Sequence, residues 1–364
     1  MFGLFVRKQA RAVSQNIKVG VVAVFAKEQN EKYIIEHHVF EQSLPEVRVY
    51  FKSSSTGIFN GIRTFRAYRK GIKLYIEKYG IPDIIHANIF TRTAVIACRT
   101  ARKLRVPFVV SEHWSRYYPE NFSYKGFLRK LMTKKSAHKA KAVIVPSEAL
   151  KDAMVAVGIQ AKYEIVPNVI ETDVFKLAKK NQKDIKHIVH VSCFEDKSKN
   201  ISGLIRSVQA LLQHRNDFIL HLVGTGQDEE KIKLMVSEML PKGVVEFHGM
   251  LDGGDLSEVM SQADFMVLSS RYETFGIVVY ESLACGVPVL VTDVAGLGGI
   301  ISAELGMIVK VGDDEALAVS MSQMLDKCQS YDQETMRKFV LNGFSAEAVA
   351  AQLVSIYNFA IEQK

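Results

Sequence analysis

Short apolar runs alternate along this 364-residue chain with longer segments of helical spacing. The runs 19–25 (VGVVAVF) and 263–268 (ADFMVL) are compact and rich in apolar residues, which predicts buried strands. The segments 201–213 and 345–361 repeat apolar residues at three- and four-residue intervals, which predicts helices. Strands that alternate with helices favour parallel sheets covered by helices on both faces. We therefore expect an α/β fold.

The charge of the chain is unevenly distributed. Residues 1–175 contain 29 Lys and Arg against 14 Asp and Glu, a net +15, whereas the remainder, with 18 against 25, carries −7. A basic first half favours contact with a polyanion, an anionic membrane or an anionic acceptor, although a charge gradient that only aids solubility is the alternative. Segment 59–79 interleaves apolar and basic residues and predicts a basic amphipathic helix, which either lies on anionic lipid or is an ordinary surface helix.

Composition also bears on location and on metals. No run approaches a membrane-spanning length, and residues 1–10 lack the long apolar core of a signal peptide. The four cysteines lie far apart, which suits a reduced setting. We expect a cytoplasmic protein, with peripheral contact at the inner face of the membrane and no nucleic-acid partner. No Asp-x-Asp motif follows a predicted strand, and no Cys or His cluster has metal-ligand spacing, so we expect no catalytic metal.

The stretch 269–288 (SSRYETFGIVVYESLACGVP) is the most informative part of the chain. It predicts a polar loop, then a helix over 275–285 with Thr274 as a candidate N-cap. A helix N-terminus that opens with small or apolar residues offers backbone N–H groups to an anion. Glu273 and Glu281 lie eight positions apart, and a carboxylate inside such a helix can accept two vicinal hydroxyls, as on a ribose.

This stretch resembles the E-x7-E segment of GT-B glycosyltransferases, most closely those of family 4, which retain anomeric configuration. The surrounding residues RYETFG and ESLACGVPV extend the resemblance beyond the two glutamates. The two glutamates alone would also fit an ordinary αβ unit, with one exposed in a loop and the other in a salt bridge on a helix. The resemblance implies two Rossmann-like domains facing a cleft. We expect an acceptor-side domain at 1–175, joined by the final helix at 345–364, and a nucleotide-sugar domain at 185–344.

The resemblance also exposes a difference at the start of the chain. Family members begin with a strand and a glycine-bearing loop that precede a helix like 2–14, and here Gly3 is about the last residue of that loop. We therefore expect the first domain to lack its first strand, with an open first sheet and part of an acceptor-side loop removed.

The resemblance implies a set of site residues. Lys199 holds the donor diphosphate, but the arginine expected six positions earlier falls on Cys193. On the first domain, His113 in the sequence SEHWS lies close to the donor sugar. The remaining expected contacts are Glu281 with the ribose hydroxyls, Glu273 with the hydroxyls of the transferred sugar, the segment Thr274, Phe275, Gly276 and Ile277 with the distal phosphate and sugar, and Gly249, Met250 and Leu251 with the base.

The expected function is that of a retaining glycosyltransferase of the hexosyltransferase type. It moves a sugar from a nucleotide-diphosphate sugar to a glycan or lipid-linked acceptor in surface polysaccharide biosynthesis, with no cofactor. The leaving phosphate itself takes the acceptor proton. Two alternatives stay open: a sugar-nucleotide epimerase, which needs further acid and base carboxylates, and a catalytically impaired binding or scaffold protein, which Cys193 and the missing strand favour.

Overall fold

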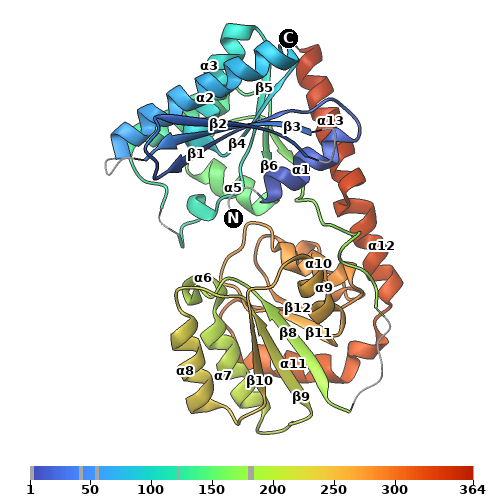
Figure 1. The fold of residues 1–364 in the computed structure, drawn as a ribbon. Coiled ribbons are helices and arrows are strands. Elements are labelled where there is room, and N and C mark those ends of the chain that lie inside the picture. Colours follow the sequence, from blue (N-terminus) through green and yellow to red (C-terminus); the bar gives the residue numbers. More distant parts are fainter. Residues whose placement is uncertain (1–3, 41–43, 54–56, 122, 179–183, 364) are drawn as a thin grey trace. The chain divides into compact units, whose positions relative to one another are not determined.

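A computed structural model describes residues 4–40, 44–53, 57–121, 123–178 and 184–363, so Gly3 lies outside the described residues. The chain divides into two compact units, Met1–Val169 with Ala346–Lys364 (unit 1) and Ile170–Ser345 (unit 2). Figure 1 shows that each unit combines β-sheet with surrounding helices. The fold is therefore α/β in both units.

The division between the units falls a few residues before the position expected from the sequence. The backbone N–H of Ile170 donates a hydrogen bond to the carbonyl of Phe344 (2.9 Å), and both Ile170 and Phe175 are buried in a core of unit 2. The segment that follows Val169 therefore packs as part of unit 2.

Unit 1 contains two β-sheets. In the three-stranded sheet, β1 (Val21–Lys27) pairs in parallel with β3 (Leu44–Lys52), which pairs antiparallel with β2 (Tyr33–Phe40). The other sheet is parallel and consists, in order, of β4 (Ile85–Asn88), β5 (Phe108–Ser111), β6 (Val143–Val145) and β7 (Tyr163–Ile165). The helices of the unit are α1 (Leu4–Ser14), α2 (Gly57–Tyr79), α3 (Val95–Leu104), α4 (Phe127–Lys139), α5 (Glu148–Ala156) and α13 (Ala346–Glu362).

The two sheets of unit 1 are not joined by any strand of the described residues. Strand β1 is at the edge of one sheet and β4 is at the edge of the other. The described strands of unit 1 therefore form two separate sheets, and the missing first strand stays a prediction. Helix α13 packs with α1, and its residues Leu353 and Tyr357 are buried in the same core as Val109 of β5.

Unit 2 has one six-stranded parallel sheet of order β10-β9-β8-β11-β12-β13. Its strands are β8 (Lys186–Val191), β9 (Phe218–Val223), β10 (Val245–Gly249), β11 (Phe265–Leu268), β12 (Val289–Thr292) and β13 (Gly306–Val309). The strand order reverses direction between β8 and β11, and ligands of such sheets bind at the carboxyl ends of the strands that flank this point. The loops after β8 and β11 are therefore where a ligand site is expected.

Helices cover both faces of the unit 2 sheet. One core contains residues of α9 (Gly253–Ser261), α10 (Ile277–Ala284) and α12 (Gln333–Phe344). The other core contains residues of α7 (Ile201–Leu211), α8 (Glu229–Met239) and α11 (Asp314–Lys327). Because both faces are packed, β8 and β11 are held in fixed register and position the loops that follow them.

Among the described residues, one stretch is long and apolar enough to cross a membrane by length and composition, Gln333–Glu362. The sequence analysis expected no such run. The stretch comprises α12 and α13. Some of its apolar residues are packed: Met336 and Val340 lie in a core of unit 2, and Leu353 and Tyr357 in a core of unit 1.

Candidate active site

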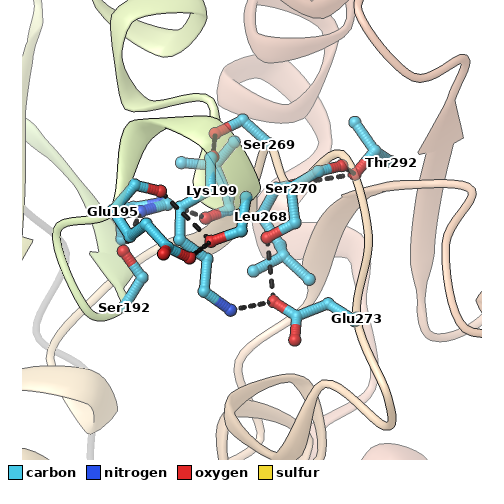
Figure 2. Close-up of polar contacts among 11 residues, drawn as sticks. Ser192, Glu195, Lys199, Leu268, Ser269, Ser270, Glu273 and Thr292 are labelled. Carbon is cyan, nitrogen blue, oxygen red and sulfur yellow. Dashed lines mark hydrogen bonds and ion pairs between the residues drawn. The ribbon is translucent and has the colours of Figure 1, made fainter. Parts of the chain in front are cut away.

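The loops that follow β8 and β11 meet at the point where the strand order reverses. The Ser269 hydroxyl donates a hydrogen bond to the backbone carbonyl of Lys199 (2.9 Å). The backbone N–H of Arg271 donates to the carbonyl of Ser198 (2.7 Å). Figure 2 shows the side chains that converge there. The fold thus brings together segments that lie about 70 residues apart in the sequence.

Lys199 and Glu273 form an ion pair in which the Lys199 ammonium donates to Glu273 Oε1. The Ser270 hydroxyl donates to the same oxygen (2.8 Å), and Thr292 Oγ1 donates to the carbonyl of Ser270 (2.7 Å) (Figure 2). The two charged side chains are only 16% and 13% exposed. Two residues predicted from the sequence to contact different parts of one donor therefore lie side by side.

The surroundings of Lys199 keep it charged. Burial alone would lower the pKa of its ammonium, but the charge of Glu273 and its hydrogen bond raise this pKa above its usual value. Both described contacts of Glu273 use Oε1, and Oε2 makes no hydrogen bond within the described part of the chain. A fixed cation and a carboxylate oxygen are thus presented at the carboxyl edge of the sheet.

Helix α10 begins beside this ion pair. Its N-cap is Gly276, whose φ of +75° is in the left-handed region that favours glycine. The prediction of Thr274 as N-cap is therefore wrong, because the glycine turns the chain and starts the helix two residues later. Gly276 supplies no side-chain acceptor to the first turn, and the N-terminus of a helix offers backbone N–H groups to an anion. Phe275 anchors this turn by stacking on Tyr280 at 4.5 Å.

The other predicted donor contacts lie in the same unit. Glu281 is the fifth residue of α10 and is only 6% exposed. At the end of β10, Gly249 has a φ of +66°, and its carbonyl accepts a hydrogen bond from Gly224 N–H (2.7 Å). Met250 is 67% exposed, whereas Leu251 packs against the core. The contacts assigned to these residues stay predictions.

Arg271 is a residue of this site that the sequence analysis did not single out. Its guanidinium donates to the carbonyl of Asp196 (2.7 Å) and to the side-chain oxygen of Asn200. These bonds hold α6 (Asp196–Lys199), the single turn that carries Lys199. Cys193, which stands where the family has an arginine, is exposed. The guanidinium of Arg271 therefore fixes the backbone of the loop that carries Lys199.

In unit 1, the loop after β5 is organised by a buried carboxylate. Glu112 is fully buried and accepts hydrogen bonds from the backbone N–H groups of Phe90 (3.2 Å), His113 (2.9 Å) and Trp114 (3.1 Å) and from the Tyr117 hydroxyl (2.7 Å). Four donors satisfy both oxygens of this carboxylate, so it positions the loop that contains His113.

His113 itself is held neutral. Burial lowers its pKa to about 3, and its ring lies 4.2 Å from that of Phe5, centroid to centroid. The charge of His86 also lowers this pKa and Asn168 opposes the shift, but within the described residues neither ring nitrogen has a hydrogen bond of standard geometry. His113 is in unit 1, whereas Glu273 is in unit 2. The contact of His113 with the donor sugar stays a prediction.

Comparison with known proteins decides the family. The family described as "Glycosyl transferases group 1" matches residues 169–343, and "Glycosyltransferase Family 4" matches residues 5–174. The chain is a group 1, family 4-like GT-B glycosyltransferase. It is therefore an enzyme that transfers a sugar from a nucleotide-sugar donor.

Two relatives and one solved structure illustrate the similarity. The glycosyltransferase is 23% identical over 321 residues to the alpha-monoglucosyldiacylglycerol synthase of Streptococcus pneumoniae, covering 82% of this chain and 70% of that protein. It is 23% identical over 366 residues to an uncharacterized 41.2 kDa protein in the cps region of Klebsiella pneumoniae, and the match covers 95% of this chain and 98% of that protein. The fold matches that of sucrose-phosphate synthase from Thermosynechococcus elongatus with a TM-score of 0.77, at 20% identity and over 99% and 94% of the two chains.

The glycosyltransferase has a buried histidine on β8, the strand that precedes the loop carrying Lys199. His190 on β8 is fully buried; its Nδ1–H donates to the carbonyl of Val267 (3.0 Å), and its Nε2 lies 2.9 Å from Ser192 Oγ. Burial lowers the pKa of His190 to about 4, and the Lys199 charge acts in the same direction. Below pH 6.5 the unfolded chain binds a proton that the folded chain does not, so the stability from this group is complete above pH 6.5 and is lost towards pH 4.

We expect the midpoint of thermal unfolding to fall as the pH is lowered from 7 to 4.5, with His190 contributing up to about 3 kcal/mol of the loss. In a His190→Asn variant the midpoint should depend less on pH over this range. Scanning calorimetry at several pH values measures how steeply the thermal midpoint depends on pH in each protein. An equal dependence in the two proteins would contradict a contribution of His190 to the acid-induced loss of stability.

Proposed function

We propose that this enzyme transfers a hexose from a nucleotide-diphosphate sugar with retention of configuration at the anomeric carbon. The observation that carries the proposal is the Lys199–Glu273 pair beside the start of α10. As the bond between sugar and phosphate breaks, negative charge develops on the leaving diphosphate. A fixed ammonium and the N–H groups of a helix N-terminus stabilise that charge without reorganisation.

The proposal gives the two glutamates different roles. Glu273 holds Lys199 through Oε1 and offers Oε2 to hydroxyls of the transferred sugar. Glu281, inside α10, accepts the two ribose hydroxyls. No protein nucleophile is assigned, and the leaving phosphate accepts the acceptor proton. We propose that no catalytic metal takes part, since Lys199 and the helix supply the positive charge.

We further propose a lipid-linked or glycan acceptor in surface polysaccharide assembly, reached from the cytoplasmic face of a membrane. Helix α4 supports contact with anionic lipid because Phe127 (83% exposed) and Leu128 (65% exposed) lie next to exposed basic residues on the same helix. Those basic residues are Arg129, Lys130, Lys134 and Lys135. Apolar side chains flanked by lysine and arginine favour insertion into an anionic interface. The similarity to a monoglucosyldiacylglycerol synthase and to a protein of a cps region agrees with this acceptor class.

A turnover assay tests the proposal. The enzyme is incubated with UDP- and GDP-hexoses, alone and with anionic vesicles that contain diacylglycerol, and the release of nucleotide diphosphate is measured. We expect release from one donor, faster with vesicles, and a glycolipid whose anomeric configuration by NMR equals that of the donor. An inverted product would contradict retention. Interconversion of the donor sugar without transfer would favour the epimerase, and nucleotide binding without turnover would favour the scaffold protein, for which the exposed Cys193 is the supporting observation.

A further inference from the structure

Three histidines and a glutamate gather on strands β8, β9 and β10 of the unit 2 sheet. Figure 1 labels these three strands in the lower part of the view. His187 belongs to β8, His221 to β9, and Glu246 and His248 to β10. The parallel register pairs Glu246 with His221 directly. His248 lies two residues beyond Glu246, at a break in this register. The grouping follows from the register of the sheet and is not visible as a motif in the sequence.

A β-bulge brings His248 into this group. Phe247 pairs with Leu222, but Gly249 pairs with the very next residue of β9, Val223, so His248 is an extra residue in its strand. Bulges are rare in parallel pairs and re-aim the side chain at which they occur. His248 Nε2 thereby reaches 2.9 Å from His221 Nδ1.

The spacing of three of these groups matches that of metal ligands. His221 Nδ1 lies 2.9 Å from His248 Nε2 and 3.4 Å from Glu246 Oε2, and the last two atoms are 4.0 Å apart. A point equidistant from these three atoms lies about 2.0 Å from each, which is the length of zinc–nitrogen and zinc–oxygen bonds. The three atoms can therefore bind one ion with little movement.

His187 supplies the outer contact that metal-binding histidines commonly have. Its Nδ1 lies 2.8 Å from His221 Nε2, and the two rings stack at 5.0 Å. With His221 Nε2–H donating to His187, the lone pair of His221 Nδ1 is directed towards Glu246 and His248. A second-shell bond of this kind fixes both the tautomer and the ring orientation of a metal ligand. The backbone N–H of His187 is in turn held by Asp264 (2.8 Å).

We propose that His221, Glu246 and His248 form a binding site for a divalent transition metal of the zinc class. Two imidazoles and one carboxylate suit zinc, whereas magnesium and calcium prefer sites built from oxygen alone. Glu246 is 53% exposed, so a fourth position is open to water. The site does not depend on the sugar-transfer reaction. The bound ion would cross-link edge strand β10 to β9 and fix His248, which directly precedes the predicted base-binding residue Gly249.

The test uses the full chain after dialysis against a chelator. Zn²⁺ is titrated by calorimetry, and Co²⁺ is added in parallel because its visible absorption reports tetrahedral nitrogen and oxygen ligands. We expect one Zn²⁺ per chain, a visible Co²⁺ spectrum and a higher thermal midpoint with Zn²⁺, since an ion that binds only the folded state stabilises it. Glu246→Gln and His248→Gln should each weaken Zn²⁺ binding at least tenfold and reduce the Co²⁺ absorption.

His214→Gln is the matched control, because His214 is an exposed histidine of the same unit outside the cluster. It should bind Zn²⁺ like the unaltered chain. His221 is left in place because its side chain is only 11% exposed and its loss would disturb the sheet. The inference is overturned if no Zn²⁺ binds, if Mg²⁺ binds equally well, or if the two cluster variants bind Zn²⁺ as tightly as His214→Gln does.

Discussion

Replacing Lys199 by methionine is expected to lower the rate of sugar transfer at saturating donor by roughly 10²–10³-fold, as the loss of one preorganised charge at a developing anion does in other enzymes. Methionine keeps a comparable side-chain length and removes the ammonium that pairs with Glu273. The loss should fall mainly on kcat, because the negative charge on the diphosphate grows as the sugar departs. Steady-state kinetics with the preferred donor measure it.

A matched variant separates this effect from a general loss of positive charge. Lys242 is an exposed lysine of the same unit, and Lys242→Met should leave kcat unchanged. Circular dichroism and the thermal midpoint show whether the Lys199→Met protein is folded, since Glu273 loses its partner in that variant. A folded Lys199→Met enzyme with the kcat of the unaltered chain would show that Lys199 does not stabilise the leaving group.

Replacing Glu281 by glutamine is expected to weaken UDP or GDP binding by about 10–100-fold, because hydrogen bonds to a charged acceptor contribute about 1.5–3 kcal/mol. The predicted contact is with ribose, so the binding of inorganic diphosphate, which has no ribose, should be unchanged in the same variant. Lys199→Met should instead strongly weaken the binding of inorganic diphosphate. Competition of nucleotide and of inorganic diphosphate against a fluorescent nucleotide measures both affinities in each variant.

Glu258→Gln serves as the control for Glu281→Gln, because Glu258 is an exposed carboxylate of unit 2 on the neighbouring helix α9. The assignment of Glu281 to the ribose fails if Glu281→Gln weakens the binding of nucleotide and of inorganic diphosphate equally. In that case the carboxylate would act by holding α10 in place, which the 6% exposure of Glu281 makes a meaningful alternative.

Much of unit 2 can be predicted from the sequence because its strands are buried on both faces and read as short apolar runs. The site stretch can be recognised because Glu273 and Glu281 occur within a longer matching segment. The pairing of Lys199 with Glu273 also follows from parallel topology, since the carboxyl ends of neighbouring strands β8 and β11 meet at one edge.

Other features could not be predicted from local pattern. Strand β2 is a half-exposed edge strand with Glu36, His37 and His38 in its middle, so it lacks an apolar run. The buried side of α4 consists of the small residues Thr133, Ser136 and Ala137, which give no amphipathic signal.

Two further differences arise from the backbone. The left-handed start of α10 at Gly276, which displaced Thr274 from the N-cap, is a property of φ that composition does not encode. The cluster of His221, Glu246 and His248 depends on strand register and on a bulge. For this reason the search for metal-ligand spacing in the sequence did not reveal it.

The most direct test of the donor site is calorimetric titration of the unaltered chain with UDP and with GDP. If the uncapped start of α10, Lys199 and Glu281 form the nucleotide-diphosphate site, one of the two nucleotides should bind at one site per chain with a Kd in the micromolar range, a free energy of about −8 kcal/mol. The nucleotide that binds identifies the base of the donor. Failure of both nucleotides to bind a folded chain would contradict the assignment of these residues to a donor site.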